Sequence, residues 1–137
     1  METVIVDAGP LVAFLKRDDE HHDWARQVFD RLTNPLLTCD SVLSEALFLL
    51  QQTHGGTEQL VTLLERGIVA PCFDLATQLS EVGKLLRKYE SVPMSLADAC
   101  LVRMVELHPR SSVFTLDSDF QIYRRNRRQT IPVISPD

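Results

Sequence analysis

The sequence predicts an α/β fold: a three-layer α/β/α sandwich around a short, mostly parallel sheet. Short runs rich in Val, Ile, Leu and Phe alternate along the chain with longer segments of helical spacing. The short runs do not alternate cleanly between apolar and polar residues, as expected for parallel strands that helices cover on both faces. The 137 residues contain no linker, internal repeat or low-complexity segment, so we expect a single domain over residues 1–137.

The expected strands are short apolar runs bounded by polar or turn-forming residues. They cover residues 3–6, 35–39, 68–73, 112–116 and 131–134. The strands 3–6 and 112–116 run directly into an aspartate. Ligands of parallel α/β sheets bind at the carboxyl ends of strands, where the strand order reverses. These two strand ends are therefore candidates for a site.

The expected helices are segments in which apolar residues recur every three or four positions. They cover residues 11–16, 20–32, 41–52, 57–66, 75–89 and 95–107. Pro10 opens the first helix and Ser95 starts the last. Asp40 or Ser41 can cap the third helix.

The composition is typical of a globular protein, with 45% hydrophobic and 24% charged residues. No apolar run approaches the roughly 20 residues that a membrane span needs, and the start METVIV lacks the basic segment of a secretory signal. Cys39, Cys72 and Cys100 are unclustered and odd in number. They indicate reduced thiols rather than a disulfide or zinc framework, so we expect a cytoplasmic protein.

The charge is unevenly distributed along the chain. The net charge is −5, which argues against a general nucleic-acid coat. Residues 84–128, however, hold nine of the 14 Lys and Arg and five of the 19 Asp and Glu, a net charge of +4. This asymmetry is consistent with an anionic partner on one side of the molecule, and equally with a solvated basic helix.

Four apolar segments are each interrupted by acids and never by a base. Asp7 is the only charge in TVIVDAGPLVAFL, Glu45 in SVLSEALFLL and Asp98 in SVPMSLADACLV. The fourth segment, SSVFTLDSDF, contains only Asp117 and Asp119. A surface carboxylate normally has polar neighbours, so each of these acids is either a local cap or a member of a site.

Helix capping can explain three of these positions. Asp7 precedes a helix that starts with proline, a common N-terminal pattern. Ser95 and Asp98 have the spacing of a capping box, with Asp in place of Glu or Gln. Asp117 can cap a turn over residues 118–124.

Glu45 has no such explanation, because it lies within an expected helix. Val42, Phe48 and Leu49 share its face, which predicts a buried carboxylate. No Lys or Arg lies three or four residues from Glu45 or Asp98. Burial of an unpaired carboxylate costs several kcal/mol, so the partner must be a distant base or a metal ion.

A divalent cation would relieve the repulsion among acids that converge at strand ends. Mg²⁺ or Mn²⁺ prefers carboxylate oxygen and retains water ligands, and such a site activates water for attack on a phosphate ester. The sequence offers no nucleophile triad and no glycine-rich phosphate loop. His21 and His22 lie in a hydrophilic turn, where we expect them to be solvated.

The segments VIVDAGPLVAFL, SEAL, SLADACLV and TLDSDF, in this order, resemble the PIN-domain nucleases. Their spacing is most similar to that of the VapC-type toxins of bacterial toxin–antitoxin pairs. The resemblance covers nearly the whole chain and implies a PIN-like fold with metal-dependent cleavage of single-stranded or structured RNA. It also implies a homodimer and a cognate antitoxin protein as partner.

The resemblance assigns roles to the isolated acids. Asp7, Glu45, Asp98 and Asp117 match the four acids of the family. Asp7 and Asp98 would hold Mg²⁺ or Mn²⁺ directly, and Asp117 directly or through water. A second ion could lie between Glu45 and Asp98, and Glu45 would orient or deprotonate the attacking water.

Two further positions match accessory residues of the family, and one departs from it. Asp119 matches an additional acid, and Thr115 matches a hydroxyl residue beside the site. Gly9 stands where many relatives carry Ser, Thr or Asn. A basic run just beyond TLDSDF is expected in a turn or short helix at the rim of the acids, where it would contact RNA phosphates; it contains Arg124, Arg125, Arg127 and Arg128.

Two other classes of protein share some of these features. One is a catalytically silent PIN-like module that binds RNA or a partner protein, which the presence of all four acids disfavours. The other is a phospho-acceptor receiver domain, which needs a lysine at the end of a late strand. Here the strand 112–116 is followed by Asp117.

Overall fold

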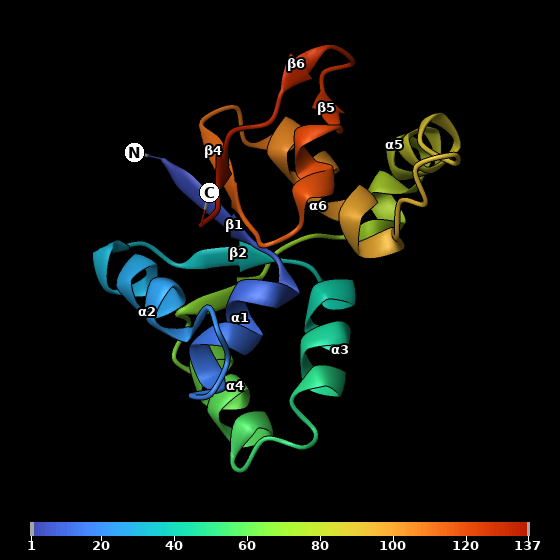
Figure 1. The fold of residues 1–137 in the computed structure, drawn as a ribbon. Helices are drawn as coiled ribbons and strands as arrows, with labels where there is room; N and C mark the ends of the chain where they lie inside the picture. The colour runs from blue at the N-terminus through green and yellow to red at the C-terminus, as the bar shows by residue number, and fades with distance from the viewer. Residues whose placement is uncertain (1, 137) are drawn as a thin grey trace.

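The computed structural model describes residues 2–136 and contains a five-stranded sheet in which all neighbouring strands are parallel (Figure 1). The strand order is β3-β2-β1-β4-β7. The strands are β1 (Thr3–Val6), β2 (Leu36–Thr38), β3 (Val69–Pro71), β4 (Ser111–Phe114) and β7 (Val133–Ile134). The predicted α/β class and parallel sheet are confirmed.

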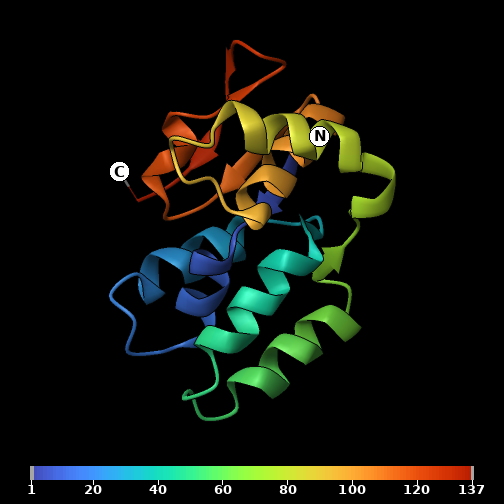
Figure 2. The ribbon, with the colours of Figure 1, turned by 90° about the vertical axis from the view of Figure 1, so that its right-hand side faces the viewer.

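Within residues 2–136, six helices cover the two faces of the sheet. They are α1 (Ala8–Leu15), α2 (His22–Arg31), α3 (Asp40–Leu49), α4 (Gly56–Glu65), α5 (Leu75–Lys88) and α6 (Leu96–Leu107). The first four lie on one side of the sheet, and α5 and α6 lie on the other (Figures 1 and 2). The result is the expected three-layer sandwich. Within residues 2–136, no helix is long and apolar enough to cross a membrane.

The core lies between the central strands and the helices on both faces. Ile5 and Val6 of β1 are fully buried, as expected for a strand in the middle of a covered parallel sheet. On one face, the Trp24 ring of α2 meets the Phe114 ring of β4 edge-on at 5.3 Å. On the other face, α6 packs on β1 and β4 through an apolar stripe that includes Leu101.

Several boundaries differ from expectation by one to three residues, and two of these concern the candidate site. Helix α1 begins at Ala8, directly after Asp7, rather than at residue 11. Pro10 lies within its first turn, where the backbone N–H that proline lacks would have no helical partner. Strand β4 ends at Phe114, so two residues separate it from Asp117.

The basic run forms a β-hairpin and not a short helix. A 3₁₀ turn, η1 (Ser118–Gln121), leads into β5 (Arg124–Arg125), which pairs antiparallel with β6 (Gln129–Thr130). The turn between these strands contains two residues with positive φ, Asn126 at 49° and Arg127 at 76°. The expectation of a turn is therefore correct, and the helical alternative is wrong.

Candidate active site at the carboxyl edge of the sheet

The isolated aspartates lie where the strand order reverses. From β1 the sheet continues through β2 and β3 on one side and through β4 and β7 on the other. Asp7 directly follows β1, and Asp117 follows β4 after two residues. In open parallel sheets this position between two diverging connections forms a crevice that binds ligands.

A pocket of about 620 Å³ opens at this edge. We call it the acid pocket, because five carboxylates line it: Asp7, Glu45, Asp98, Asp117 and Asp119. Within residues 2–136, its lining contains no Lys, Arg or His. The structure thus brings together all four predicted acids and the additional Asp119, with no base to neutralise them.

Asp7 is held by two hydrogen bonds. Its Oδ1 accepts from the backbone N–H of Ala8 at 2.8 Å, and its Oδ2 accepts from the Thr115 hydroxyl at 2.8 Å. The residue is 8% exposed. Burial raises the pKa of Asp7 to about 6; the two hydrogen bonds oppose this, and the charges of Asp98 and Glu45 add to it.

Thr115 lies behind the acid pocket and connects two of its acids. Its hydroxyl donates to Asp7 and accepts from the backbone N–H of Asp117 at 2.9 Å. Asp117 in turn caps η1, because its Oδ1 accepts from the backbone N–H of Asp119 at 2.9 Å. This chain of contacts fixes how Asp7 and Asp117 lie relative to each other.

Asp98 is fixed by the capping box of α6 and by a tyrosine. Its Oδ2 accepts from the backbone N–H of Ser95 at 3.2 Å and from the Tyr123 hydroxyl at 3.0 Å. Burial raises the pKa of Asp98, opposed by these hydrogen bonds, and the nearby Asp117 raises it further. Tyr123 is fully buried, and its contact with Asp98 was not predicted from the sequence. Nothing in the local sequence around a single tyrosine beside a basic run indicates a hydrogen bond to a distant aspartate.

The capping interpretation is confirmed for three of the aspartates, and it is compatible with their predicted role in a site. Asp7, Asp98 and Asp117 all accept hydrogen bonds that cap a helix or a 3₁₀ turn. The same three carboxylates line the acid pocket. Capping explains how each acid is positioned locally, but it does not explain why all of them face one pocket without a base.

The predicted burial of Glu45 is wrong. Glu45 is exposed, and its apolar neighbours Phe48 and Leu49 are 68% and 48% exposed. Helix α3 buries Val42, one of the three residues expected beside Glu45, together with Ala46. The cost of burying an unpaired carboxylate therefore gives no reason to expect a metal ion or base at Glu45. Its side chain lines the acid pocket from an exposed surface of α3.

Gly9, where the sequence departs from the family, lines the acid pocket and lies close to Leu116. A Cβ on this residue would lie 3.2 Å from Cδ1 of Leu116. A larger residue would thus require Leu116 to shift by a few tenths of an ångström. A Ser or Thr at residue 9, as in many relatives, would therefore contact the Leu116 side chain.

The predicted RNA-binding arginines lie elsewhere. Within residues 2–136, none of the four lines the acid pocket. Arg124 and Arg127 line a second cavity. The Arg125 side chain donates to the carbonyl of Pro109, and Arg128 lies exposed on the hairpin. Their predicted contact with RNA is not tested by this geometry.

The donor set of the acid pocket suits a hard divalent cation. Carboxylate oxygen is the preferred ligand of Mg²⁺ and Mn²⁺. No three His, Cys, Asp or Glu side chains within residues 2–136 lie close enough together to enclose an ion. Mg²⁺ is usually bound through only one or two carboxylates and keeps several waters. The open pocket fits that mode of binding and not a closed protein cage.

Comparisons with known proteins agree with this architecture. The family model of the PIN domain matches residues 4–126. The crystal structure of Mycobacterium tuberculosis VapC20, described as a sarcin-ricin loop cleaving toxin, superposes with a TM-score of 0.79 and 17% sequence identity, over 95% of this chain and 100% of that chain. No curated protein sequence matches the chain. On the family match, which spans most of its length, the chain belongs to the PIN-domain family.

Proposed function

We propose that the protein is a metal-dependent endoribonuclease that hydrolyses RNA phosphodiester bonds and acts as the toxin of a toxin–antitoxin pair. The observation that carries this proposal is the gathering of five acids, with no base, around one pocket of a PIN-family chain. The similar M. tuberculosis structure is that of a toxin described as cleaving the sarcin-ricin loop, which supports RNA as the class of substrate.

Asp7 and Asp98 would hold Mg²⁺ or Mn²⁺, with Asp117 as a further ligand, directly or through water. The ion would lower the pKa of a bound water and stabilise charge on the phosphate. The hydrogen bonds from Thr115 to Asp7 and from Tyr123 to Asp98 hold these carboxylates in place. Such fixed outer contacts orient metal ligands and tune their basicity.

Glu45 is the candidate for handling the attacking water. It lines the acid pocket but is exposed on α3, so its carboxylate can orient water or accept a proton from it. Because Glu45 lines the same pocket as Asp98, a second ion between them is also compatible with the structure. Asp119 lines the same pocket and would contribute to a secondary site.

We also propose a cytoplasmic homodimer that binds a cognate antitoxin. The exposed apolar side chains Phe48, Leu49 and Leu79 are candidates for coverage by a partner chain. Light scattering on the purified protein should give the mass of a dimer. A small open reading frame beside the gene that encodes a DNA-binding protein would identify the antitoxin.

The catalytically silent PIN-like module is the alternative. It would bind RNA or a partner protein without cleavage and would have no need of the acids. The complete acid set and its fixed hydrogen bonds favour the nuclease.

Metal-dependent cleavage of RNA is the direct test. Purified protein is incubated with total RNA in Mn²⁺ or Mg²⁺, in EDTA, and with the Asp98→Asn variant as control. We expect cleavage products only with the wild type and metal. Undiminished cleavage in EDTA, or RNA that binds but stays intact with either metal, would contradict the proposal.

A further inference from the structure

A second cavity, of about 530 Å³, lies between α5, α6 and the β5–β6 hairpin. Helix α6 contacts both α5 and strand β5 of the hairpin. Five basic residues from these three elements line it, and we call it the basic groove: Lys84, Lys88, Arg103, Arg124 and Arg127. Only two acids share the lining, so the ionisable side chains of the groove sum to a charge of +3.

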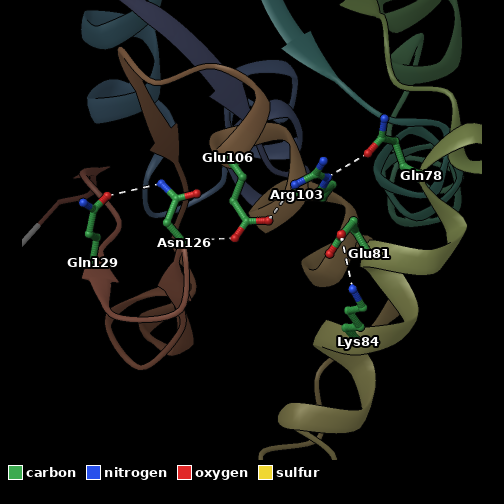
Figure 3. Close-up of polar contacts among 7 residues, drawn as sticks. All are labelled: Gln78, Glu81, Lys84, Arg103, Glu106, Asn126 and Gln129. Carbon is green, nitrogen blue, oxygen red and sulfur yellow. Dashed lines mark hydrogen bonds and ion pairs between the residues drawn. The ribbon is translucent and has the colours of Figure 1, made fainter.

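Each acid of the basic groove already has a partner. Glu106 on α6 is 12% exposed and pairs with Arg103 at 3.2 Å. Its other oxygen accepts from the backbone N–H of Asn126 at 2.7 Å, which ties the hairpin to α6 (Figure 3). Glu81 and Lys84 form an exposed pair at 3.5 Å along α5, and such pairs are weak.

The remaining cations are not neutralised. Lys88 donates to the carbonyl of Arg127 at 2.9 Å, and the Arg124 guanidinium donates only to backbone carbonyls of residues 121–123. Among residues 2–136, no carboxylate pairs with Lys88, Arg124 or Arg127. These side chains keep charge and donors available to an anion.

The basic groove and the acid pocket both involve helix α6. Asp98 lines the acid pocket and Arg103 lines the groove, roughly 8 Å farther along the helix axis and about 140° around it. Tyr123 bonds Asp98, and the next residue, Arg124, lines the groove. A nucleic-acid strand advances roughly 3.4 Å per nucleotide, so a few nucleotides span the two.

We propose that the basic groove binds backbone phosphates of the RNA, a few nucleotides from the bond held in the acid pocket. The proposal rests on the proposed ribonuclease function and adds Lys84 and Lys88 of α5 to the RNA contacts. An acidic pocket in a protein of net charge −5 repels a polyanion, so nearby positive charge is needed to hold the strand. The groove offers few apolar side chains, whereas an acidic protein partner would need buried anchors.

The test compares two triple variants that each remove three positive charges. K84Q/K88Q/R127Q removes exposed groove cations, and the control R26Q/R31Q/R66Q removes exposed arginines from α2 and the end of α4. The probe is a fluorescein-labelled single-stranded RNA of about twelve nucleotides. Its binding is measured by anisotropy in EDTA over a series of salt concentrations.

We expect the groove variant to bind the RNA more weakly and with a flatter salt dependence. The slope of log K against log salt should fall by up to about 2, which corresponds to three lost phosphate contacts on a single strand. The control should keep the slope of the wild type. If the groove variant fails to fold, the single variants K88Q and R127Q should each reduce the slope by about 0.7.

Equal affinity and slope for the groove and control variants would overturn the proposal. Tighter binding of poly-glutamate than of the RNA probe to the wild type would also overturn it, in favour of an acidic protein. Cleavage of RNA in Mn²⁺ is measured separately. Loss of RNA binding in the groove variant, with a wild type that does not cleave, would support the groove and reject the nuclease.

Discussion

The acid pocket and the basic groove both involve α6 but hold their charges in different ways. In the acid pocket, short carboxylates at strand and helix ends are fixed by capping bonds and by buried hydroxyls. In the basic groove, long side chains such as Lys88 extend from exposed surfaces. The backbone therefore determines the positions of the acids, whereas the cations can adapt to a ligand.

The two regions also differ in their energetic cost. Desolvation and mutual repulsion raise the pKa of Asp7 and Asp98, so their ionised forms destabilise the metal-free protein. The exposed cations of the groove are solvated and cost little. This difference is consistent with the two proposals, in which a cation would relieve the repulsion in the acid pocket and the groove would bind RNA phosphates.

The largest expected effect is the loss of cleavage in Asp98→Asn. Loss of a direct ligand should exceed the roughly 10–100-fold loss typical when a hydrogen-bond partner of a ligand is removed. RNA affinity in EDTA should not fall below that of the wild type, because the groove is unchanged and one repelling charge is removed. Cleavage and anisotropy on the same preparation measure both. Normal cleavage with a lower melting temperature would show that Asp98 only caps the helix and is not a metal ligand.

Tyr123→Phe should lower metal affinity or cleavage by roughly 10–100-fold, because it removes the hydroxyl that holds Asp98. Tyr89→Phe is the matched control. Tyr89 is also buried and its ring packs edge-on against Tyr123, but its hydroxyl accepts from the backbone N–H of Arg124. Equal losses in the two variants would show that the hydroxyl of Tyr123 acts only through general stability.

The pH dependence of stability should differ between the wild type and Asp7→Asn. The folded pKa of Asp7, about 6, lies above its unfolded value of 3.8. The folded state therefore binds a proton more tightly, and stability falls as pH rises from about 4 to 6. Between pH 7.5 and 5, the metal-free wild type should gain about 1 kcal/mol relative to Asp7→Asn.

Urea unfolding in EDTA at the two pH values measures this difference. Because Asn also caps helices well, Asp7→Asn can keep the start of α1 while it removes the charge. Its amide nitrogen replaces the oxygen that accepts from Thr115, and the resulting loss of stability is the same at both pH values. A wild type that loses stability relative to the variant at pH 5 would show that Asp7 is stabilised as an anion in the folded protein.

The smallest expected effects are on stability, in one variant beside the acid pocket and one in the basic groove. Ser95→Ala removes a cap of α6 and should cost about 1 kcal/mol, since the Ser95 hydroxyl accepts from the backbone N–H of Asp98. Lys84→Ala in the groove should cost no more than about 0.5 kcal/mol, as it breaks only an exposed pair. Thermal unfolding of the two variants compares them. If Lys84→Ala lost more stability than Ser95→Ala, the groove and not the acid pocket would be the region held in place by its hydrogen bonds.

Much of the fold and the acid pocket could be predicted from the sequence. The spacing of apolar residues within each segment is a local property of the sequence. It located the five strands of the parallel sheet and the six helices of residues 2–136 to within a few residues. Asp7, Asp98 and Asp117 stood out because each interrupts an apolar segment, and the structure brings them together. A short acid next to a strand or helix end has its position fixed by the local backbone.

The remaining features depend on contacts between distant segments. The burial of α3 could not be inferred from its own spacing, because Phe48 and Leu49 are as apolar as the residues it buries. The contact between Tyr123 and Asp98 joins residues 25 positions apart. The basic groove combines α5, α6 and the hairpin, and only its hairpin arginines formed a visible run in the sequence.

Calorimetric titration of Mn²⁺ into metal-free protein tests the central claim, that the acid pocket is a metal site, most directly. We expect saturable binding to the wild type and to K84Q/K88Q/R127Q, with loss of binding in Asp98→Asn. Millimolar Mn²⁺ should raise the melting temperature of the wild type and the groove variant but not that of Asp98→Asn, since an ion that binds only the folded state stabilises it. Absence of binding heat in the wild type, or equal binding by Asp98→Asn, would contradict the account.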